Sequence, residues 1–242
     1  MSKIAAIVPA AGLGTRMGAD TPKPKQFLEL DGVPLIIFTL RRLAACAAIT
    51  EFFISTRADD VMALQAMVAK AGLGKPARVV HGGDTRQQSV GNALAQVDPA
   101  TEIVLVHDAV RPFVTVAQIE RVIAEARARG AAILGIPAID TVKEVKRASL
   151  PEDVALISAT IPRERIVLAQ TPQVFAYPLL RDAFKKAQQD GVTASDEAVI
   201  VERFGHDVFV VVGSDRNLKI TRPADMELAA FYLEQERRDA RK

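Results

Sequence analysis

The chain has 242 residues, of which 49% are hydrophobic and 25% are charged, and its formal net charge is +2. This balance is typical of a soluble globular protein and excludes an intrinsically disordered chain. The small net charge gives no general attraction to nucleic acid or to an anionic membrane, so basic residues matter only locally. We expect one large α/β domain over residues 1–242 rather than two ordinary ones.

The chain contains one cysteine, Cys46, so no disulfide can form within it, which indicates a reducing compartment. The neighbours of Cys46 are rich in alanine and offer no histidine or cation to activate a thiol, which favours a packed core residue over a nucleophile. The apolar run that follows Met1 ends at Pro9 and is too short for a signal peptide or a membrane span. We therefore expect a cytoplasmic protein.

Short apolar runs alternate with helical patterns along most of the chain. The expected strands are Ala5–Val8, Phe52–Ser55, Arg78–Val80, Ile103–His107, Ala131–Ile136, Ile166–Ala169 and Val208–Val212. Apolar residues recur every 3.6 positions between them, for example in Ile119–Ala128, and a closing helix is expected over Ala224–Lys242. This alternation predicts a mostly parallel sheet with helices on both faces. Ligands then bind beyond the carboxyl ends of the strands.

The segment 140–160 interrupts this rhythm. It is polar and irregular, and its candidate short strands contain Val142, Val145, Leu156 and Ile157. A stretch of this length without structure of its own is uncommon in a compact domain. An ordinary surface loop is the alternative, but we favour a two-stranded arm or a contact with a partner.

The loop Pro9–Met17 follows the first expected strand. Its small residues are Ala10, Ala11, Gly12 and Gly14. Small residues let the backbone approach a ligand closely, and successive N–H groups can form an anion-binding nest. Arg16 adds a planar fork that can bind a phosphate with two hydrogen bonds. The loop lacks the Gly-Lys-Ser/Thr ending of a Walker A loop, and Met17 stands where a dinucleotide fingerprint needs its third glycine. We interpret it as a phosphate cradle of neither common type, with a plain strand–helix connection as the alternative.

Two lysines follow this loop in the segment Thr21-Pro22-Lys23-Pro24-Lys25. The alternating prolines forbid a helix and hold the lysines in an extended segment. A stiffened lysine beside a phosphate loop is a point charge for a polyphosphate, and a solvated basic loop is the alternative. The residue types do not choose between Lys23 and Lys25.

The segment Gly82–Val90 follows another expected strand and opens a helix. Asp84 or Thr85 is expected to cap that helix, while Arg86 and Ser89 share one of its faces. Polar groups at such a strand end can bind a base or a ribose, and a simple capped helix start is the alternative.

Asp108 ends the most apolar strand in the chain. A carboxylate there suits Mg²⁺, because Mg²⁺ prefers one or two carboxylates together with phosphate oxygens and water. Arg111, three residues later, is placed to bind a second phosphate. His107 is expected to be a packed residue rather than a general base.

Further polar segments lie late in the chain. Lys219 stands between apolar neighbours and is expected to be partly buried, which is tolerable if it meets a phosphate. Ser195–Ala198 is expected to be a helix N-cap whose acidic residues complement the helix dipole. Asp140–Lys143 and Gln170–Gln173 each follow an expected strand.

Taken in order, these motifs resemble the 2-C-methyl-D-erythritol 4-phosphate cytidylyltransferase family. The motifs are Pro9–Met17, Pro24–Gln26, Gly82–Val90, His107–Pro112, Asp140–Lys143, Gln170–Gln173, Ser195–Ala198 and Asn217–Asp225. The resemblance implies a single Rossmann-like domain whose protruding β-arm makes a homodimer and completes the partner's active site. It also implies transfer of CMP from CTP to methylerythritol phosphate in non-mevalonate isoprenoid biosynthesis, with release of pyrophosphate.

The resemblance further implies a role for each candidate residue. The catalytic cations would be Arg16, Lys25 and Lys219, with Lys25 preferred over Lys23 because it keeps Lys-Gln-Phe together. The residues that hold CTP would be Ala10, Ala11, Gly12, Gly14, Gly82, Gly83, Asp84, Arg86, Ser89 and Ala109, and Asp108 would bind Mg²⁺. The sugar-alcohol phosphate would be bound by Arg111, Thr141, Arg163 and Thr171, with Arg163 and Thr171 reaching it across the dimer.

The implied mechanism follows from charge. The substrate phosphate is already an anionic nucleophile, so it attacks the α-phosphorus of CTP without a general base, and preorganised cations counter the repulsion between the two anions.

The sequence leaves alternative functions open. One alternative is a cytidylyltransferase for another polyol phosphate, such as ribitol 5-phosphate, because the sequence hardly distinguishes between these substrates. A non-catalytic nucleotide-binding regulator is a second alternative, although a metal carboxylate would be superfluous in it. The missing third glycine disfavours a nicotinamide oxidoreductase.

Overall fold

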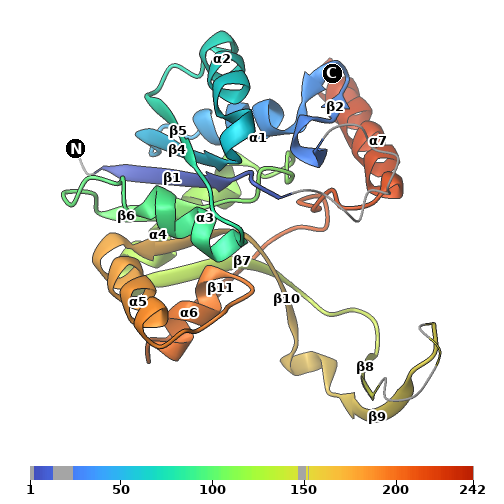
Figure 1. Cartoon of the computed structure of the whole chain (residues 1–242). Helices are drawn as coiled ribbons and strands as arrows, with labels where there is room; N and C mark the ends of the chain where they lie inside the picture. The colour runs from blue at the N-terminus through green and yellow to red at the C-terminus, as the bar shows by residue number, and fades with distance from the viewer. Residues whose placement is uncertain (1–2, 13–23, 147–150, 152, 242) are drawn as a thin grey trace.

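A seven-stranded sheet forms the centre of the computed structural model, which describes residues 3–12, 24–146, 151 and 153–241. The strand order is β11-β7-β10-β6-β1-β4-β5 (Figure 1). These strands are β1 (Ile4–Pro9), β4 (Glu51–Thr56), β5 (Ala77–His81), β6 (Ile103–Val106), β7 (Ala131–Pro137), β10 (Val167–Ala176) and β11 (Phe209–Val212). β10 runs antiparallel to both of its neighbours, and the other neighbouring pairs are parallel. The predicted mostly parallel sheet is confirmed.

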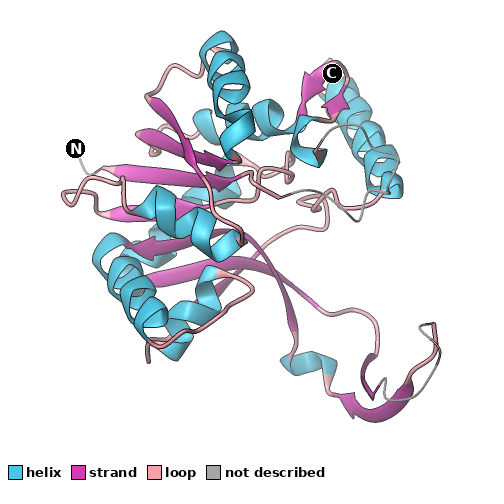
Figure 2. Cartoon of the chain, in the orientation of Figure 1, coloured by secondary structure: helices cyan, strands magenta, loops and turns pink. Residues whose placement is uncertain are grey.

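Helices cover both faces of this sheet, as Figure 2 shows. The first face carries α1 (Leu35–Ala44), α2 (Val61–Ala71) and α4 (Val116–Arg129), and the second carries α3 (Arg86–Leu94), α5 (Tyr177–Gln189) and α6 (Glu197–Arg203). Alternate side chains of β1 enter the two cores, Ile4 on one side and Ala5 on the other. Strands buried on both faces are apolar throughout, which is why the sequence revealed them. In the described part of the chain, no helix is long and apolar enough to cross a bilayer.

A smaller third core lies beside the sheet. The hairpin of β2 (Glu29–Leu30) and β3 (Val33–Pro34) packs there against the C-terminal helix α7 (Pro223–Asp239). Next to this core, the backbone N–H of Ile220 donates a hydrogen bond to the carbonyl oxygen of Val110 at 2.9 Å. That bond holds the segment before α7 against the loop that follows β6.

The predicted two-stranded arm is present. β8 (Val142–Lys146) and β9 (Leu156–Ile161) pair antiparallel and project beyond the sheet (Figure 1). Apolar side chains of the arm are open to solvent, with Leu156 64% and Ile157 58% exposed. An isolated two-stranded hairpin is only marginally stable in water, so an arm with exposed apolar side chains is a natural contact surface.

Two local expectations were wrong. Residues 170–173 do not follow a strand but lie inside β10, at the point where its register with β7 shifts between Ala169 and Gln173. Lys25 is not extended but begins the short 3-10 helix η2 (Lys25–Phe27). Pro24 has an extended ψ of 140°, so the extended segment ends at Pro24 and does not, as we had expected, include Lys25.

Candidate active site

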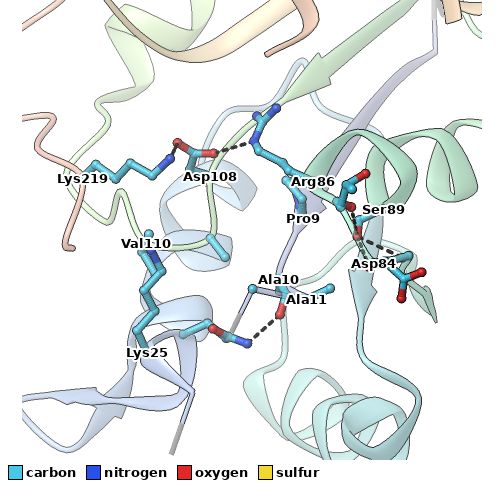
Figure 3. Close-up of a pocket in the computed structure, with 15 residues that line it drawn as sticks. Pro9, Ala10, Ala11, Lys25, Asp84, Arg86, Ser89, Asp108, Val110 and Lys219 are labelled. Atoms are coloured by element: carbon cyan, nitrogen blue, oxygen red, sulfur yellow. Dashed lines mark hydrogen bonds and ion pairs between the residues drawn. The ribbon is translucent and has the colours of Figure 1, made fainter. Parts of the chain in front are cut away.

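A cavity of about 200 Å³ lies at the carboxyl ends of β1, β5 and β6. Its lining comprises residues 9–12 after β1, residues 83–86 and Ser89 after β5, residues 108–110 after β6, and Lys25, Gln26 and Lys219. Figure 3 shows Lys25 and Lys219 on one side of it and Asp84 and Ser89 on the other. This cavity lies at the edge of the sheet where the strand-end rule places a ligand.

A second cavity of about 140 Å³ shares Arg86, Asp108 and Lys219 with the first. Its other lining residues are Arg111, Ala169, Gln170, Thr171, Gln173, Ser195 and Asp196. Two ligands that occupied the two cavities would meet at the three shared side chains.

Close packing explains the glycines in front of α3. A Cβ atom on Gly82 would lie 2.8 Å from the Cβ of Ala11 and 2.9 Å from the Oγ of Ser89. A Cβ atom on Gly83 would lie 2.4 Å from the Cβ of Gln88. The loops that follow β1 and β5 can therefore approach each other only because position 82 has no side chain. This approach brings the start of α3 to the cavity.

Thr85, rather than Asp84, caps α3. The Thr85 hydroxyl accepts a hydrogen bond from the Gln88 N–H at 3.1 Å, and the Gln88 side chain accepts one from the Thr85 N–H at 3.2 Å. This reciprocal capping box satisfies the first turn of the helix. Ser89 accepts from the Gly83 N–H at 3.0 Å and donates to the Thr85 carbonyl oxygen at 2.9 Å. Ser89 thus fixes the shape of the loop that carries Asp84 into the cavity wall.

Gln26 anchors the short helix η2 to the end of β1. It is 2% exposed, and its Nε2 donates to the carbonyl oxygen of Ala10 at 2.6 Å. The sequence placed Gln26 in a motif with Lys25 but indicated no contact for it. The structure shows that this contact positions Lys25 at the edge of the cavity (Figure 3).

Five charged side chains meet between the two cavities. The Oδ2 atom of Asp108 lies 3.0 Å from the Nζ of Lys219 and 3.3 Å from the Nε of Arg111. Its Oδ1 atom lies 3.3 Å from the Nε of Arg86. The two terminal nitrogens of Arg86 donate to both oxygens of Glu197, at 2.7 and 3.0 Å. Three cations and two anions leave one net positive charge, so the cluster attracts an anionic ligand.

These neighbours set the ionisation of the cluster. Burial raises the pKa of the Asp108 carboxyl, but Arg86, Lys219 and Arg111 outweigh that effect and hold the pKa well below its ordinary value. Burial likewise opposes the charge of Arg86, yet Glu197 and Asp108 raise the pKa of its guanidinium. At neutral pH, Asp108 is therefore an anion beside a fully charged Arg86.

His107 is a packed residue, as we predicted, and not a general base. Burial lowers the pKa of its ring to about 4, so the ring is neutral at neutral pH. Its Nε2 lies 3.0 Å from the carbonyl oxygen of Arg111, which can only accept, so the N–H is on Nε2. The Nδ1 atom then accepts from the Thr171 hydroxyl at 3.0 Å. Both ring nitrogens are used within the protein.

Thr171 belongs to the site of its own chain. It is 4% exposed and lines the second cavity, and its oxygen accepts from the backbone N–H of Asp108 at 3.0 Å. Our expectation that Thr171 reaches a substrate across a dimer was wrong, because its side chain bonds His107 and Asp108 of the same chain.

Thr141 and Arg163 are not brought to this site by their own chain. Both are exposed near the arm, and the Nη1 of Arg163 donates to the carbonyl oxygen of Ile139 at 2.6 Å. Among the described residues that line the two cavities, neither is present. Their contact with a substrate stays a prediction that requires a partner subunit. Gly14, Arg16 and Lys23 lie outside the described residues.

Comparison with known proteins assigns the chain to a family. The profile of the 2-C-methyl-D-erythritol 4-phosphate cytidylyltransferase family matches residues 4–235. The chain belongs to this family. A 2-C-methyl-D-erythritol 4-phosphate cytidylyltransferase of Acidobacterium capsulatum is 54% identical over 96% of this chain and 98% of the relative. Another, from Solibacter usitatus, is 48% identical over 97% of each chain.

Solved structures of such cytidylyltransferases share the fold. The 4-diphosphocytidyl-2C-methyl-D-erythritol synthase of Anaerococcus prevotii superposes with a TM-score of 0.81 at 29% identity, covering 96% of this chain and 99% of that one. The 2-C-methyl-D-erythritol 4-phosphate cytidylyltransferase of Thermus thermophilus gives 0.75 at 33% identity, over 95% and 98%. The predicted family and fold are confirmed.

Sequence reasoning missed the position of Glu197. Asp196 caps α6 as we expected, accepting from the Val199 N–H at 3.2 Å. Glu197 does not lie in solvent beside the helix dipole but is 0% exposed and pairs with Arg86. The sequence contained one sign of a special role for Glu197, a second acidic residue directly after the capping aspartate. Its pairing with Arg86 could be recognised only from the structure, which places α3 and α6 on the same face of the sheet.

Proposed function

We propose that this cytidylyltransferase transfers CMP from CTP to 2-C-methyl-D-erythritol 4-phosphate. The products are 4-diphosphocytidyl-2-C-methyl-D-erythritol and pyrophosphate, in a step of non-mevalonate isoprenoid biosynthesis. The observation that carries the proposal is the pair of cavities that share Arg86, Asp108 and Lys219. Such a pair can hold a nucleotide and a second phosphate with their reacting ends together.

CTP occupies the first cavity in this proposal. The residues assigned to it are Ala10, Ala11, Gly12, Gly14, Lys25, Gly82, Gly83, Asp84, Arg86, Ser89 and Ala109. The sugar-alcohol phosphate occupies the second cavity, where Arg111 and Thr171 lie. Thr141 and Arg163 of a partner subunit complete that second site.

The reaction is an in-line displacement at phosphorus. A phosphate oxygen of the sugar alcohol forms a bond to the α-phosphorus of CTP, the bond to the bridging oxygen breaks, and pyrophosphate leaves with that electron pair. No proton has to be removed from the nucleophile, which agrees with a neutral, fully bonded His107. Lys25, Lys219 and Arg16 stabilise the negative charge that builds on the phosphoryl oxygens.

Mg²⁺ is the proposed metal, with Asp108 as its carboxylate. In the part of the chain that the structure describes, no group of three or more histidine, cysteine or acidic residues is placed to hold a metal. Mg²⁺ does not need such a group, because it binds through one or two carboxylates and completes its shell with phosphate oxygens and water. A single aspartate beside the nucleotide cavity matches that donor set, and the ion would neutralise charge on the triphosphate. Both oxygens of Asp108 already pair with Arg86, Arg111 and Lys219, so Mg²⁺ would have to share this carboxylate with those cations.

The cytoplasm is the proposed compartment. Cys46 is free and buried, so the fold contains no disulfide that would need an oxidising environment. A nucleoside triphosphate is also a substrate that the cytoplasm supplies.

We propose a homodimer formed through the arm. The exposed apolar side chains of Leu156 and Ile157 carry this proposal. We expect a mass in solution of twice the 26.1 kDa of one chain, and a monomer after Leu156→Asp and Ile157→Asp are introduced together. Met62→Asp is the matched control, because Met62 is 80% exposed on α2, away from the arm. Sedimentation velocity measures all three masses, and a monomeric wild type would refute the proposal.

The experiment that tests the function is a pyrophosphate-release assay with CTP and Mg²⁺. We expect release with 2-C-methyl-D-erythritol 4-phosphate and none when the polyol phosphate is omitted. Release with ribitol 5-phosphate only would instead select a cytidylyltransferase for another polyol phosphate. Release with neither substrate would remove the transferase proposal and favour a non-catalytic nucleotide-binding protein.

A further inference from the structure

Glu197 is a fully buried carboxylate. It lines neither of the two cavities, but it pairs with Arg86, which lines both. It is the first residue of α6, and its two oxygens accept from the two terminal nitrogens of Arg86 at 2.7 and 3.0 Å. A two-bond contact of this kind fixes the plane of a guanidinium as well as its distance. Glu197 therefore determines how Arg86 is presented to the cavities.

Glu197 is itself held in place from behind. The side chain of Gln173, on β10, donates to Asp196 at 2.8 Å and accepts from the backbone N–H of Ala198 at 3.0 Å. Gln173 is 1% exposed, so this clamp lies inside the protein. It ties the start of α6 to the central sheet on both sides of Glu197, which leaves the carboxylate little freedom to move.

The third bond of Arg86 shows what this positioning achieves. With its terminal nitrogens on Glu197, Arg86 uses Nε to reach Oδ1 of Asp108 at 3.3 Å. The other oxygen, Oδ2, then serves Lys219 and Arg111. If Glu197 lost its charge, Arg86 would be drawn to Asp108 with its terminal nitrogens and would compete with Lys219 for that carboxylate.

Stability alone does not account for the pair. A buried ion pair generally stabilises a protein no more than packed apolar residues of similar volume do. The start of α6 does not need Glu197 either, because Asp196 already caps it. The pair is therefore better explained by what it does for Arg86.

We infer that Glu197 is a positioning residue for nucleotide binding. It holds Arg86 in the wall that the two cavities share and reserves one oxygen of Asp108 for Lys219 and Arg111. The inference rests on one part of the proposed function, the binding of CTP by Arg86, and not on the transfer reaction itself.

The first test is Glu197→Gln, which keeps the shape of the side chain and removes its charge. We expect kcat/KM for CTP to fall by roughly tenfold or more, because misplacing a group that positions substrate is costly. Most of the loss should appear in KM, since Arg86 contacts the nucleotide before reaction. Glu197→Asp should recover part of the loss. Glu125→Gln is the matched control, because Glu125 pairs with Arg129 on the exposed side of α4, and its kcat/KM should stay within about twofold of wild type.

A double-mutant cycle separates positioning from a merely structural role. If Glu197 acts through Arg86, adding Glu197→Gln to Arg86→Gln should lower kcat/KM by less than about twofold further. A full additional tenfold loss in the double mutant would overturn the inference. Melting temperatures show whether each variant is folded at the assay temperature. If Glu197→Gln is unfolded there, Glu197→Asp replaces it in the cycle.

A titration of CTP with Mg²⁺, followed by calorimetry, tests the inference without turnover. We expect Glu197→Gln to raise the dissociation constant of CTP by roughly tenfold, in parallel with the expected rise in KM. If the wild type releases no pyrophosphate but the variant still weakens binding, the proposed function fails and the inference stands. If wild type and variant bind CTP equally and have equal kcat/KM, the inference fails while the proposed function stands.

Discussion

Lys219→Ala is expected to lower kcat by at least about a hundredfold while the fold stays intact, since loss of one preorganised donor costs roughly 3–4 kcal/mol. Lys219 lines both cavities, and its Nζ lies 3.0 Å from Asp108. Negative charge builds up there as two anions approach each other, so the cation matters more in the transition state than before it. The rate of pyrophosphate release at saturating CTP and methylerythritol phosphate measures the effect.

Two further variants control this prediction. Lys219→Arg keeps the charge and should retain more activity than Lys219→Ala. Lys186→Ala makes the same change at an exposed lysine, which pairs with Asp190 at 2.9 Å on α5, and should leave kcat within about twofold of wild type. A kcat near the wild-type value in Lys219→Ala would contradict the electrostatic mechanism.

The location of the site could be predicted because it depends on local patterns. β1, β4 and β6 are largely apolar runs buried on both faces, and small or polar residues directly follow β1, β5 and β6. Parallel strands end at one edge of a sheet, so the order of these runs was enough to bring Ala10, Asp84 and Asp108 together. The place of Lys219 beside Asp108 has no such local cause. It depends on the backbone bond from Ile220 to Val110, between segments far apart in the sequence.

The polar middle of β10 could not be predicted for the same physical reason. Residues 170–173 look like a loop because polar side chains are unusual in a central strand. Each finds its partner on another element: Thr171 bonds Asp108 after β6, and Gln173 bonds the start of α6. A buried polar side chain is stable when it is hydrogen-bonded, but the sequence pattern shows only its neighbours along the chain. The burial and pairing of Glu197 could not be predicted for the same reason, since its partner Arg86 lies on α3, far away in the sequence.

Asp108→Asn is expected to lower the free energy of unfolding by about 3 kcal/mol at neutral pH, because removing one partner of a buried ion pair leaves the other charges uncompensated. In the described part of the chain, Asp108 is the carboxylate with which both Arg111 and Lys219 pair. This loss of stability should lie at the low end of the range for breaking a buried ion pair, because the Lys219 side chain is 34% exposed and solvent screens its charge. Catalysis should be lost as well, because Lys219 and Arg86 are both positioned through this carboxylate.

The pH dependence of that loss distinguishes an ionic role of Asp108 from a packing role. The folded state lowers the pKa of Asp108, so its contribution is complete above the unfolded pKa of about 3.9 and disappears as the pH falls through the folded pKa. The difference between wild type and Asp108→Asn should therefore be constant from pH 7 to pH 5 and shrink below about pH 4. Urea unfolding at these pH values measures it, with Asp98→Asn at the exposed Lys3 pair as a matched control that should change little. A difference that stays constant below about pH 4 would show that packing, and not charge, is what Asp108 contributes.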